Sequence, residues 1–162
     1  MVTFISHSPA ETEALGEAWA AQCGCGWVIG LSGPLGAGKT QLVRGLARGL
    51  NAAARVASPA YALVHEYPGG RLPLFHLDLY RLDTREQIIA AGLEPYLVRP
   101  EGVTVVEWVE RWLDGTGLPW IAPGPFRRAQ FKTLGETDRE IAYEDFVAAS
   151  ALCADSPQPT SS

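Results

Sequence analysis

The fold of this chain is decided by the stretch Gly33-Pro34-Leu35-Gly36-Ala37-Gly38-Lys39-Thr40. It fits the pattern G-x-x-x-x-G-K-[ST], which is typical of a loop that binds phosphate groups. Glycines in such a loop permit positive φ angles and let backbone N–H groups approach phosphate oxygens closely. The pattern predicts that Lys39 reaches the β- and γ-phosphates of a nucleotide and that Thr40 offers its hydroxyl to Mg²⁺.

The residues on either side of the loop supply the context that this motif requires. Residues 27–31 are a short apolar run of strand length, as expected for a buried parallel strand. Residues 41–50 place four apolar side chains on one helical face, namely Leu42, Val43, Leu46 and Leu50. Strand, loop and helix follow in the required order, which disfavours the alternative of a glycine-rich turn that binds nothing.

Length and composition predict one domain without a membrane span. The chain has 162 residues, 47% of them hydrophobic, which is enough to bury a core. We expect residues 1–154 to form a single domain and residues 155–162 to be a disordered tail. No apolar run approaches the roughly 20 residues that cross a bilayer. The first residues lack the features of a signal peptide, so a cytoplasmic location is expected.

The charge and the cysteine content limit which ligands the chain is expected to bind. Thirteen Lys and Arg against eighteen Asp and Glu give a net charge of −5, and no basic cluster exceeds the pair Arg127-Arg128. Affinity for nucleic acid comes largely from neutralising phosphates, so direct tight binding to nucleic acid is not expected. We interpret Cys23, Cys25 and Cys153 as reduced, structurally incidental thiols, because their number is odd and the Cys23-Gly24-Cys25 pair has no second metal-ligand pair.

Helix signals occur before and after the loop. Ser8-Pro9-Ala10-Glu11 has the form of a capping box with proline at the first helical position, which predicts a helix over residues 9–22. A short helix is predicted over residues 84–91, capped by Asp83 or Thr84 and ended by Gly92.

Much of the remaining sequence has patterns that are typical of strands. Residues 61–67 and 71–78 are two strand-like runs joined through Pro68-Gly69-Gly70, which predicts a hairpin. Alternation places His76 and Asp78 on one face of the second run, and we expect His76 to hold Asp78 by a hydrogen bond rather than to act as a base.

The C-terminal third carries another buried strand and a second hairpin. Residues 102–108 form an apolar, β-branched run that ends near the carboxylate of Glu107. Residues 109–113 are expected to turn helical. Residues 129–134 and 139–143 are predicted to pair across a turn, and residues 144–153 to form a last helix.

Four separated stretches of the chain agree with one known family. They are the loop at residues 33–40, Ser58-Pro59 with Tyr61, the run from His76 to Arg81 (HLDLYR), and Val106-Glu107-Trp108. Together they resemble the TsaE (YjeE) family of small bacterial ATPases, and the likeness runs over most of the chain. The resemblance implies a three-layer α/β fold like that of P-loop NTPases, with a mostly parallel central sheet and antiparallel additions.

The same resemblance implies an activity and partners. It implies a P-loop ATPase that binds ATP and Mg²⁺ and hydrolyses ATP slowly alone. It also implies support of the TsaB–TsaD pair in forming N6-threonylcarbamoyladenosine at position 37 of tRNA. Because the partners would handle the tRNA, this agrees with the acidic charge balance.

Roles carry over to individual positions of this sequence. The resemblance implies that Lys39 contacts the phosphates, that Thr40 contacts Mg²⁺, and that Asp78 and Glu107 are essential acids, so Lys39, Asp78 and Glu107 are the expected catalytic residues; it leaves open which acid touches the metal. We favour Glu107 as the direct Mg²⁺ ligand because it ends the more uniformly apolar strand. Asp78 is then the acid that orients the attacking water or acts with the switch loop. The expected nucleotide contacts are Gly33, Leu35, Gly36, Ala37, Gly38, Lys39, Thr40, Gln41 and Trp108.

Two positions depart from the family pattern. Pro34 stands where the family commonly has an acid, at a position that contributes backbone rather than chemistry. Ala60 stands where the family usually has threonine, within a loop that corresponds to a switch. Either Ser58 substitutes for the missing hydroxyl or the gating is weaker.

Two other functions use the same loop. A small-molecule or nucleoside kinase would also need an arginine-bearing lid, for which Arg127 and Arg128 are the candidates, and a nucleotide-gated adaptor would use ATP only as a structural ligand. Arg81 is a candidate for a charge-stabilising arginine, an inter-subunit contact or a surface salt bridge, of which we favour the last two, and we interpret Tyr80 as a packing residue. No clear arginine finger is visible, which predicts slow intrinsic hydrolysis.

Overall fold

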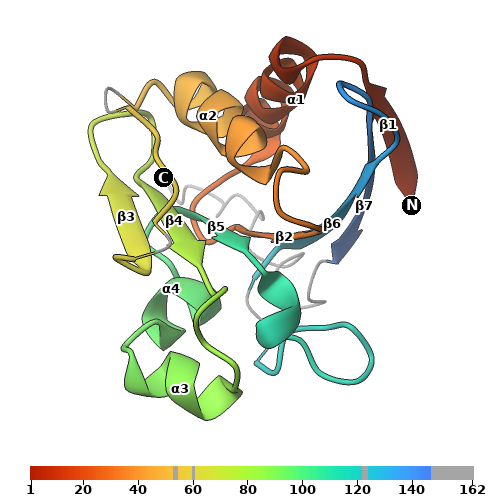
Figure 1. The fold of residues 1–162 in the computed structure, drawn as a ribbon. Coiled ribbons are helices and arrows are strands. Elements are labelled where there is room, and N and C mark those ends of the chain that lie inside the picture. Colours follow the sequence, from red (N-terminus) through yellow and green to blue (C-terminus); the bar gives the residue numbers. More distant parts are fainter. Residues whose placement is uncertain (53–54, 60, 122–123, 147–162) are drawn as a thin grey trace, which may run out of the picture.

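The computed structural model describes residues 1–52, 55–59, 61–121 and 124–146, which form one seven-stranded sheet with helices on both faces (Figure 1). The strands are β1 (Val2–Ser6), β2 (Val28–Ser32), β3 (Val64–Tyr67), β4 (Leu74–Asp78), β5 (Val103–Glu107), β6 (Phe126–Thr133) and β7 (Arg139–Phe146). The helices are α1 (Pro9–Gln22), α2 (Lys39–Gly49), α3 (Arg85–Ala90) and α4 (Glu94–Val98), and a 3₁₀ helix, η1, covers Val109–Arg111.

The sheet has a parallel centre and antiparallel edges. Its strand order is β1-β7-β6-β2-β5-β4-β3. Parallel pairing joins β6 to β2, β2 to β5 and β5 to β4, whereas β7, β1 and β3 are added antiparallel. This topology confirms the expected α/β fold, and the two predicted hairpins are the pairs β3–β4 and β6–β7.

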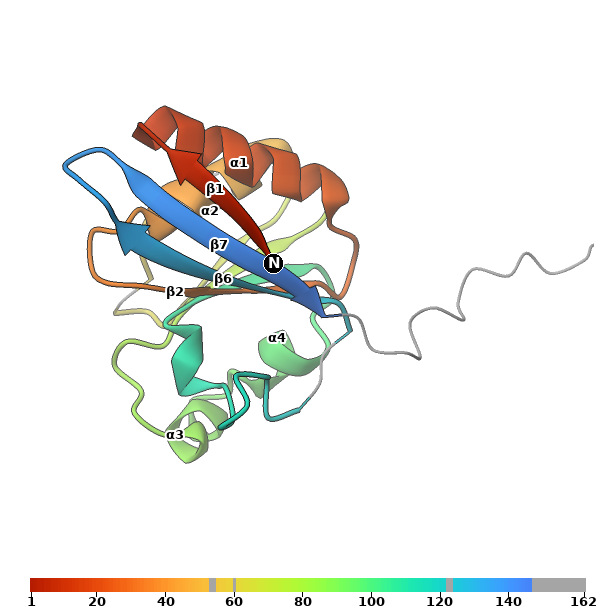
Figure 2. The ribbon, with the colours of Figure 1, turned by 90° about the vertical axis from the view of Figure 1, so that its right-hand side faces the viewer.

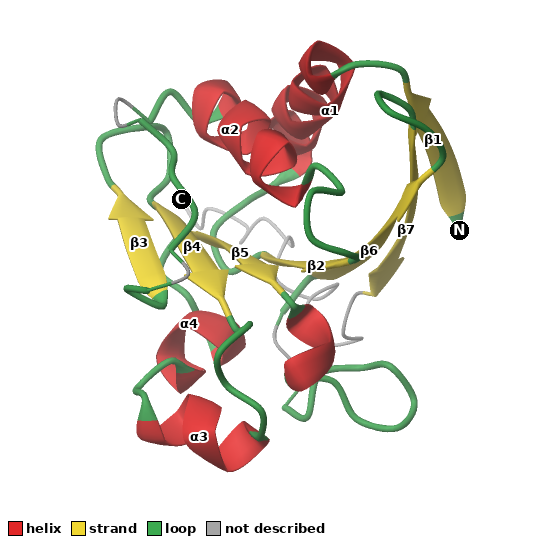
Figure 3. Cartoon of the chain, viewed as in Figure 1, coloured by secondary structure: helices red, strands yellow, loops and turns green. Residues whose placement is uncertain are grey.

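Helices cover the sheet in two separate layers. Helices α1 and α2 lie on one face and α3, α4 and η1 on the other, as Figures 2 and 3 show from two directions. Two hydrophobic clusters fill the spaces between sheet and helices, one containing Leu46 of α2 and the other Ile88 of α3. Successive residues of β4 alternate between them, with Leu74 in the first and Leu77 in the second. This alternation directs the even-numbered residues of β4 toward α2.

Helix α1 begins where the capping pattern predicted. The Ser8 hydroxyl accepts a hydrogen bond from the Glu11 N–H at 3.1 Å, and Pro9 occupies the first turn. The Glu11 carboxylate in turn accepts from the backbone N–H of His7 at 2.7 Å. The cap side chain thus satisfies one backbone donor of the first helical turn, and the Glu11 side chain satisfies another just before the cap.

Helices α1 and α2 pack closely because α2 carries a glycine at the contact. A Cβ atom on Gly45 would overlap the carbonyl oxygen of Glu13 in α1. Gly45→Ala is therefore expected to lower the melting temperature, since overpacking of about 1–3 kcal/mol exceeds the roughly 1 kcal/mol that alanine gains in helix propensity. Gly115→Ala is the control, because no atom lies within 4 Å of a Cβ built there. Equal melting temperatures for both variants would contradict this packing account.

The structure also changes parts of the sequence prediction. It contains β1, which pairs with β7, and the short helix α4, neither of which was predicted. The predicted helix over residues 144–153 is wrong for residues 144–146, which continue β7 until Phe146 stacks on Phe126 across the β6–β7 pair. Residues 147–162, with the predicted tail, lie outside the described residues. Within the described part, no helix is long and apolar enough to cross a membrane.

Candidate nucleotide-binding site

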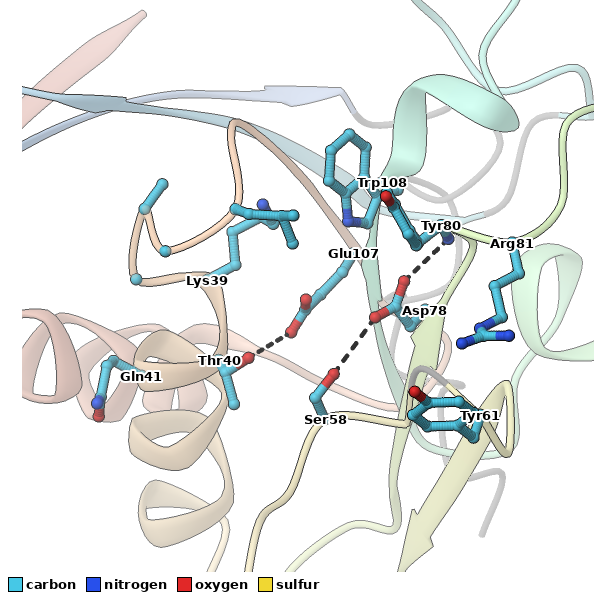
Figure 4. Close-up of a pocket in the computed structure, with 14 residues that line it drawn as sticks. Lys39, Thr40, Gln41, Ser58, Tyr61, Asp78, Tyr80, Arg81, Glu107 and Trp108 are labelled. Atoms are coloured by element: carbon cyan, nitrogen blue, oxygen red, sulfur yellow. Dashed lines mark hydrogen bonds between the residues drawn. The ribbon is translucent and has the colours of Figure 1, made fainter.

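The sequence-predicted residues meet at the carboxyl ends of the central strands, where open α/β sheets bind their ligands. A cavity of about 520 Å³ opens there (Figure 4). It is lined by Leu35, Gly36, Ala37, Gly38, Lys39, Thr40, Gln41, Ser58, Tyr61, Asp78, Tyr80, Arg81, Glu107 and Trp108. Every predicted site residue except Gly33 is in this set, and Gly33 lies in the same loop.

The loop between β2 and α2 has the backbone form that the glycine pattern predicted. Gly33, Gly36 and Gly38 have φ angles of +139°, +75° and +97°, which disfavour residues with side chains. Gly38 is the N-cap of α2 and supplies no side-chain hydrogen bond to its first turn. The first N–H groups of α2 therefore remain available to an anion, at the positive end of the helix dipole.

Lys39 is held inside the loop. Its Nζ donates hydrogen bonds to the carbonyl oxygens of Gly33 and Pro34, and it lies 4.8 Å from the ring centroid of Trp108. Burial lowers the pKa of this ammonium group, while the charges of Glu107, Glu110 and Asp78 act in the opposite direction. Trp108 has a left-handed backbone, with φ +60° and ψ +41°, a conformation that a non-glycine residue adopts only when its surroundings enforce it.

The two predicted acids face each other across neighbouring strands. Asp78 is paired with Glu107 in the register of β4 and β5. Thr40 Oγ1 donates to Glu107 Oε1 at 3.0 Å, while Asp78 accepts from Ser58 Oγ at 3.3 Å and from the Tyr80 N–H at 2.9 Å. Burial raises the pKa of Asp78, and the nearby Glu107 charge raises it further against the opposing hydrogen bonds.

The raised pKa of Asp78 predicts how the protein's stability depends on pH. The folded state binds this proton more tightly than the unfolded state, so the free energy of unfolding falls as pH rises from the ordinary carboxyl value of 3.8 through the raised folded pKa. Asp78→Asn removes this dependence and the repulsion by Glu107. At neutral pH we expect its nucleotide-free melting temperature to equal or exceed that of the parent protein. A clearly lower value in calorimetry would show that the carboxylate stabilises the fold.

His76 has a different partner from the one expected. Its Nε2 lies 3.0 Å from Glu107 Oε1, and the structure records no hydrogen bond to Asp78. The expectation that His76 holds Asp78 is therefore wrong. The sequence placed His76 on the face of β4 that carries Asp78, but the strand register brings the longer Glu107 side chain back toward it.

The structure removes one of the two roles expected for Arg81 and shows where Tyr80 packs. The guanidinium of Arg81 lies 4.1 Å from the ring centroid of Tyr61, and no carboxylate pairs with it among the described residues, so a salt bridge does not explain it. Tyr80 is 45% exposed, lines the cavity and lies 5.0 Å from the Trp108 ring. Both residues belong to the HLDLYR run, so this motif could have identified them as residues of the cavity. The departure at Ala60 lies outside the described residues.

The arginines proposed as a kinase lid are built into the sheet. Arg127 is buried, donates to both carboxylate oxygens of Asp145 and lies 4.7 Å from the Trp19 ring centroid. Arg128 donates to the carbonyl oxygen of Gly117 and to Glu144. Neither lines the 520 Å³ cavity, so the feature that favoured a kinase is lost.

The cysteines that the structure describes have no role at this site. Cys23 and Cys25 are free thiols. Burial raises the pKa of Cys23 to about 11, which keeps it protonated and unsuited to bind a metal. Cys153 lies outside the described residues.

The donor set at the cavity suits a metal that binds together with a nucleotide. The described residues include no group of three or more His, Cys, Asp and Glu side chains arranged to hold a metal by themselves. Mg²⁺ commonly takes one or two protein oxygens and completes its shell with phosphates and water. Thr40 and Glu107, joined by their hydrogen bond at the end of the loop, fit that pattern.

Comparisons with known proteins agree with this geometry. The family model described as "Threonylcarbamoyl adenosine biosynthesis protein TsaE" matches residues 6–140. The Synechocystis protein named tRNA threonylcarbamoyladenosine biosynthesis protein TsaE is 47% identical over 103 residues, which cover 62% of this chain and 65% of that protein. The Bacillus subtilis protein of the same name is 36% identical over 139 residues, covering 84% of this chain and 80% of that one.

A solved structure gives the same result. The crystal structure of Bacillus subtilis YdiB superimposes with a TM-score of 0.71 at 32% sequence identity, covering 91% of this chain and 86% of that one. Because the family model spans most of the chain, including the loop, both acids and the HLDLYR run, the chain belongs to the TsaE family of threonylcarbamoyl adenosine biosynthesis proteins.

Proposed function

We propose that this protein is an ATPase that binds ATP with Mg²⁺ and supports the formation of N6-threonylcarbamoyladenosine at position 37 of tRNA. The observation that carries the proposal is the 3.0 Å hydrogen bond from Thr40, at the end of the phosphate-binding loop, to Glu107, with Asp78 paired beside it. A loop that bound a phosphate without a metal ion or an activated water would need neither acid. Asp78 lies buried with a raised pKa, which is the environment expected of a functional carboxyl group.

Phosphoryl transfer requires positioning of the reactants and stabilisation of charge, and different residues of the site are proposed for each. The first N–H groups of α2 and the Lys39 ammonium group bind the phosphate oxygens. Thr40 and Glu107 would hold Mg²⁺, which would neutralise the charge that develops on the phosphates. Asp78 orients the attacking water. Lys39 donates to the carbonyl oxygens of Gly33 and Pro34, so its side chain is expected to exchange at least one of these partners for a phosphate oxygen when a nucleotide binds.

A second, smaller cavity supports a proposal for where the nucleoside binds. It has a volume of about 160 Å³ and shares Gly36, Gly38 and Gln41 with the larger cavity. Its remaining lining comes from the start of α1 and the β6–β7 turn, including Ser8 and Arg139. We assign the base and ribose to this side of the loop, because Asp78 and Glu107 line only the other cavity.

The proposed partners are the TsaB and TsaD proteins, and one experiment separates this function from its alternatives. Phosphate release is measured with the protein alone, with purified TsaB and TsaD, and with candidate acceptor molecules. Slow release that the partners accelerate is the expected result. Transfer to an acceptor would instead identify a kinase. Partner binding that requires ATP without release would identify a nucleotide-gated adaptor.

The protein alone is expected to have no useful affinity for tRNA at physiological salt. Its net charge is −5, and Arg127 and Arg128, its one basic pair, are engaged by Asp145 and Glu144. Few phosphates can therefore be neutralised on binding. The measurement is a filter-binding titration with tRNA over a range of salt concentrations. Submicromolar, salt-sensitive binding by the isolated protein would contradict the assignment of the tRNA to the partners.

A further inference from the structure

His76 is a fully buried polar side chain that contacts Glu107, the proposed metal ligand. Its exposed fraction is 0%, and its Nε2 lies 3.0 Å from Glu107 Oε1. The same oxygen accepts the Thr40 hydroxyl at 3.0 Å. No described residue forms a hydrogen bond with Oε2 of Glu107, so both protein contacts converge on one oxygen of the carboxylate.

The contacts also favour one of the two tautomers of the neutral imidazole ring. Nδ1 of His76 is buried and has no hydrogen-bond partner among the described residues. A neutral ring with its hydrogen on Nε2 donates to Glu107. In that tautomer the buried Nδ1 is an acceptor, and it is the only polar atom of the ring without a hydrogen-bond partner in the described part of the chain. The other tautomer would place two acceptors, Nε2 and Oε1, against each other and leave a buried N–H unpaired.

From this geometry we infer that His76 is a positioning residue for Glu107. By holding Oε1 in place together with Thr40, it fixes the carboxylate orientation and leaves Oε2 free to face the metal. Side chains that orient a metal ligand in this way typically change metal affinity or activity by about 10- to 100-fold when they are replaced. The inference rests on the proposed function, since it needs a metal beside Glu107.

A purely structural role for His76 predicts a different outcome. The chain offers a matched buried polar group in Thr104, which lies on β5 with Glu107 but donates to the carbonyl oxygen of Tyr96, on the other face of the sheet. Loss of either hydrogen bond should disturb the core in a similar way. Only His76 contacts Glu107, so only its loss should change metal binding.

The test measures metal binding rather than turnover. Mn²⁺ is titrated into the protein–ADP complex and the free ion is followed by electron paramagnetic resonance, with Mg²⁺ as competitor. His76→Phe keeps a ring but removes the donor and should weaken Mn²⁺ binding about 10- to 100-fold, with ADP affinity in EDTA unchanged. His76→Gln can still donate from its amide and should recover most of the loss. Thr104→Val should bind Mn²⁺ like the parent protein.

The outcomes separate this inference from the function on which it rests. If the parent protein–ADP complex retains no Mn²⁺, the proposed function fails. If the parent complex binds Mn²⁺ and His76→Phe binds it equally well, or if Thr104→Val weakens binding as much as His76→Phe does, the positioning role is overturned. Should His76→Phe not fold, ¹⁵N chemical shifts of the imidazole in the parent protein still decide. Protonation on Nε2 that is disturbed in Glu107→Gln supports the contact, and protonation on Nδ1 alone contradicts it.

Discussion

Lys39→Ala is expected to abolish ATP hydrolysis and to weaken nucleotide affinity by roughly 10- to 100-fold. A hydrogen bond to a charged group contributes about 1.5–3 kcal/mol, and loss of a group that stabilises developing charge lowers the rate by a further 10²–10³-fold or so. The change should leave the fold intact. Burial already disfavours the charged form of Lys39, as its lowered pKa shows, and the side chain projects into the loop rather than the core.

The sequence supplies a matched control for this experiment. Lys132 is the other lysine of the chain; it lies on β6, where it pairs with Glu140 at 3.3 Å and is 59% exposed. Lys132→Ala should bind and hydrolyse ATP like the parent protein, since exposed ion pairs contribute little. Calorimetric titration and phosphate release measure both properties. Hydrolysis by Lys39→Ala at the parent rate would show that the loop is not the catalytic phosphate site.

The fold was largely predictable because its strongest signals are local. The glycine pattern of the loop, the capping residues before α1 and the apolar run of β5 each specify a backbone form within a few residues. Their order along the chain then allows few topologies, since parallel strands require crossover connections. The sequence shows two strands that each end in an acid, and the register of β4 and β5 places Asp78 opposite Glu107.

Features that depend on distant partners could not be predicted in this way. Strand β1 exists because β7 pairs with it, a contact between residues about 140 positions apart in the chain. Residues 144–146 are strand rather than helix because they pair with β6, where Phe146 lies opposite Phe126. Likewise, His76 shares a strand with Asp78, yet its partner comes from β5. Strand alternation gives the face of a side chain but not which neighbour it reaches.

Removal of either acid should affect the reaction, but in different ways. Glu107→Gln is expected to make activity depend on a much higher Mg²⁺ concentration, because Glu107 accepts from Thr40 at the loop and is the proposed metal ligand. Asp78→Asn is expected to lower turnover with the Mg²⁺ requirement nearly unchanged, because its contacts run to Ser58 and the Tyr80 N–H rather than to the loop. Both changes keep the size of the side chain.

The assay is phosphate release across a Mg²⁺ titration in the presence of TsaB and TsaD, with the melting temperature of each nucleotide-free variant as a check on folding. The stability measurement matters because Asp78→Asn is expected to fold at least as well as the parent protein, so a loss of turnover cannot be attributed to unfolding. If Mg²⁺ rescues Asp78→Asn but not Glu107→Gln, the two roles are exchanged. If both variants keep full turnover, neither carboxylate takes part in the reaction, and the Thr40–Glu107 contact is then a structural hydrogen bond at the end of a loop that binds phosphate without hydrolysing it.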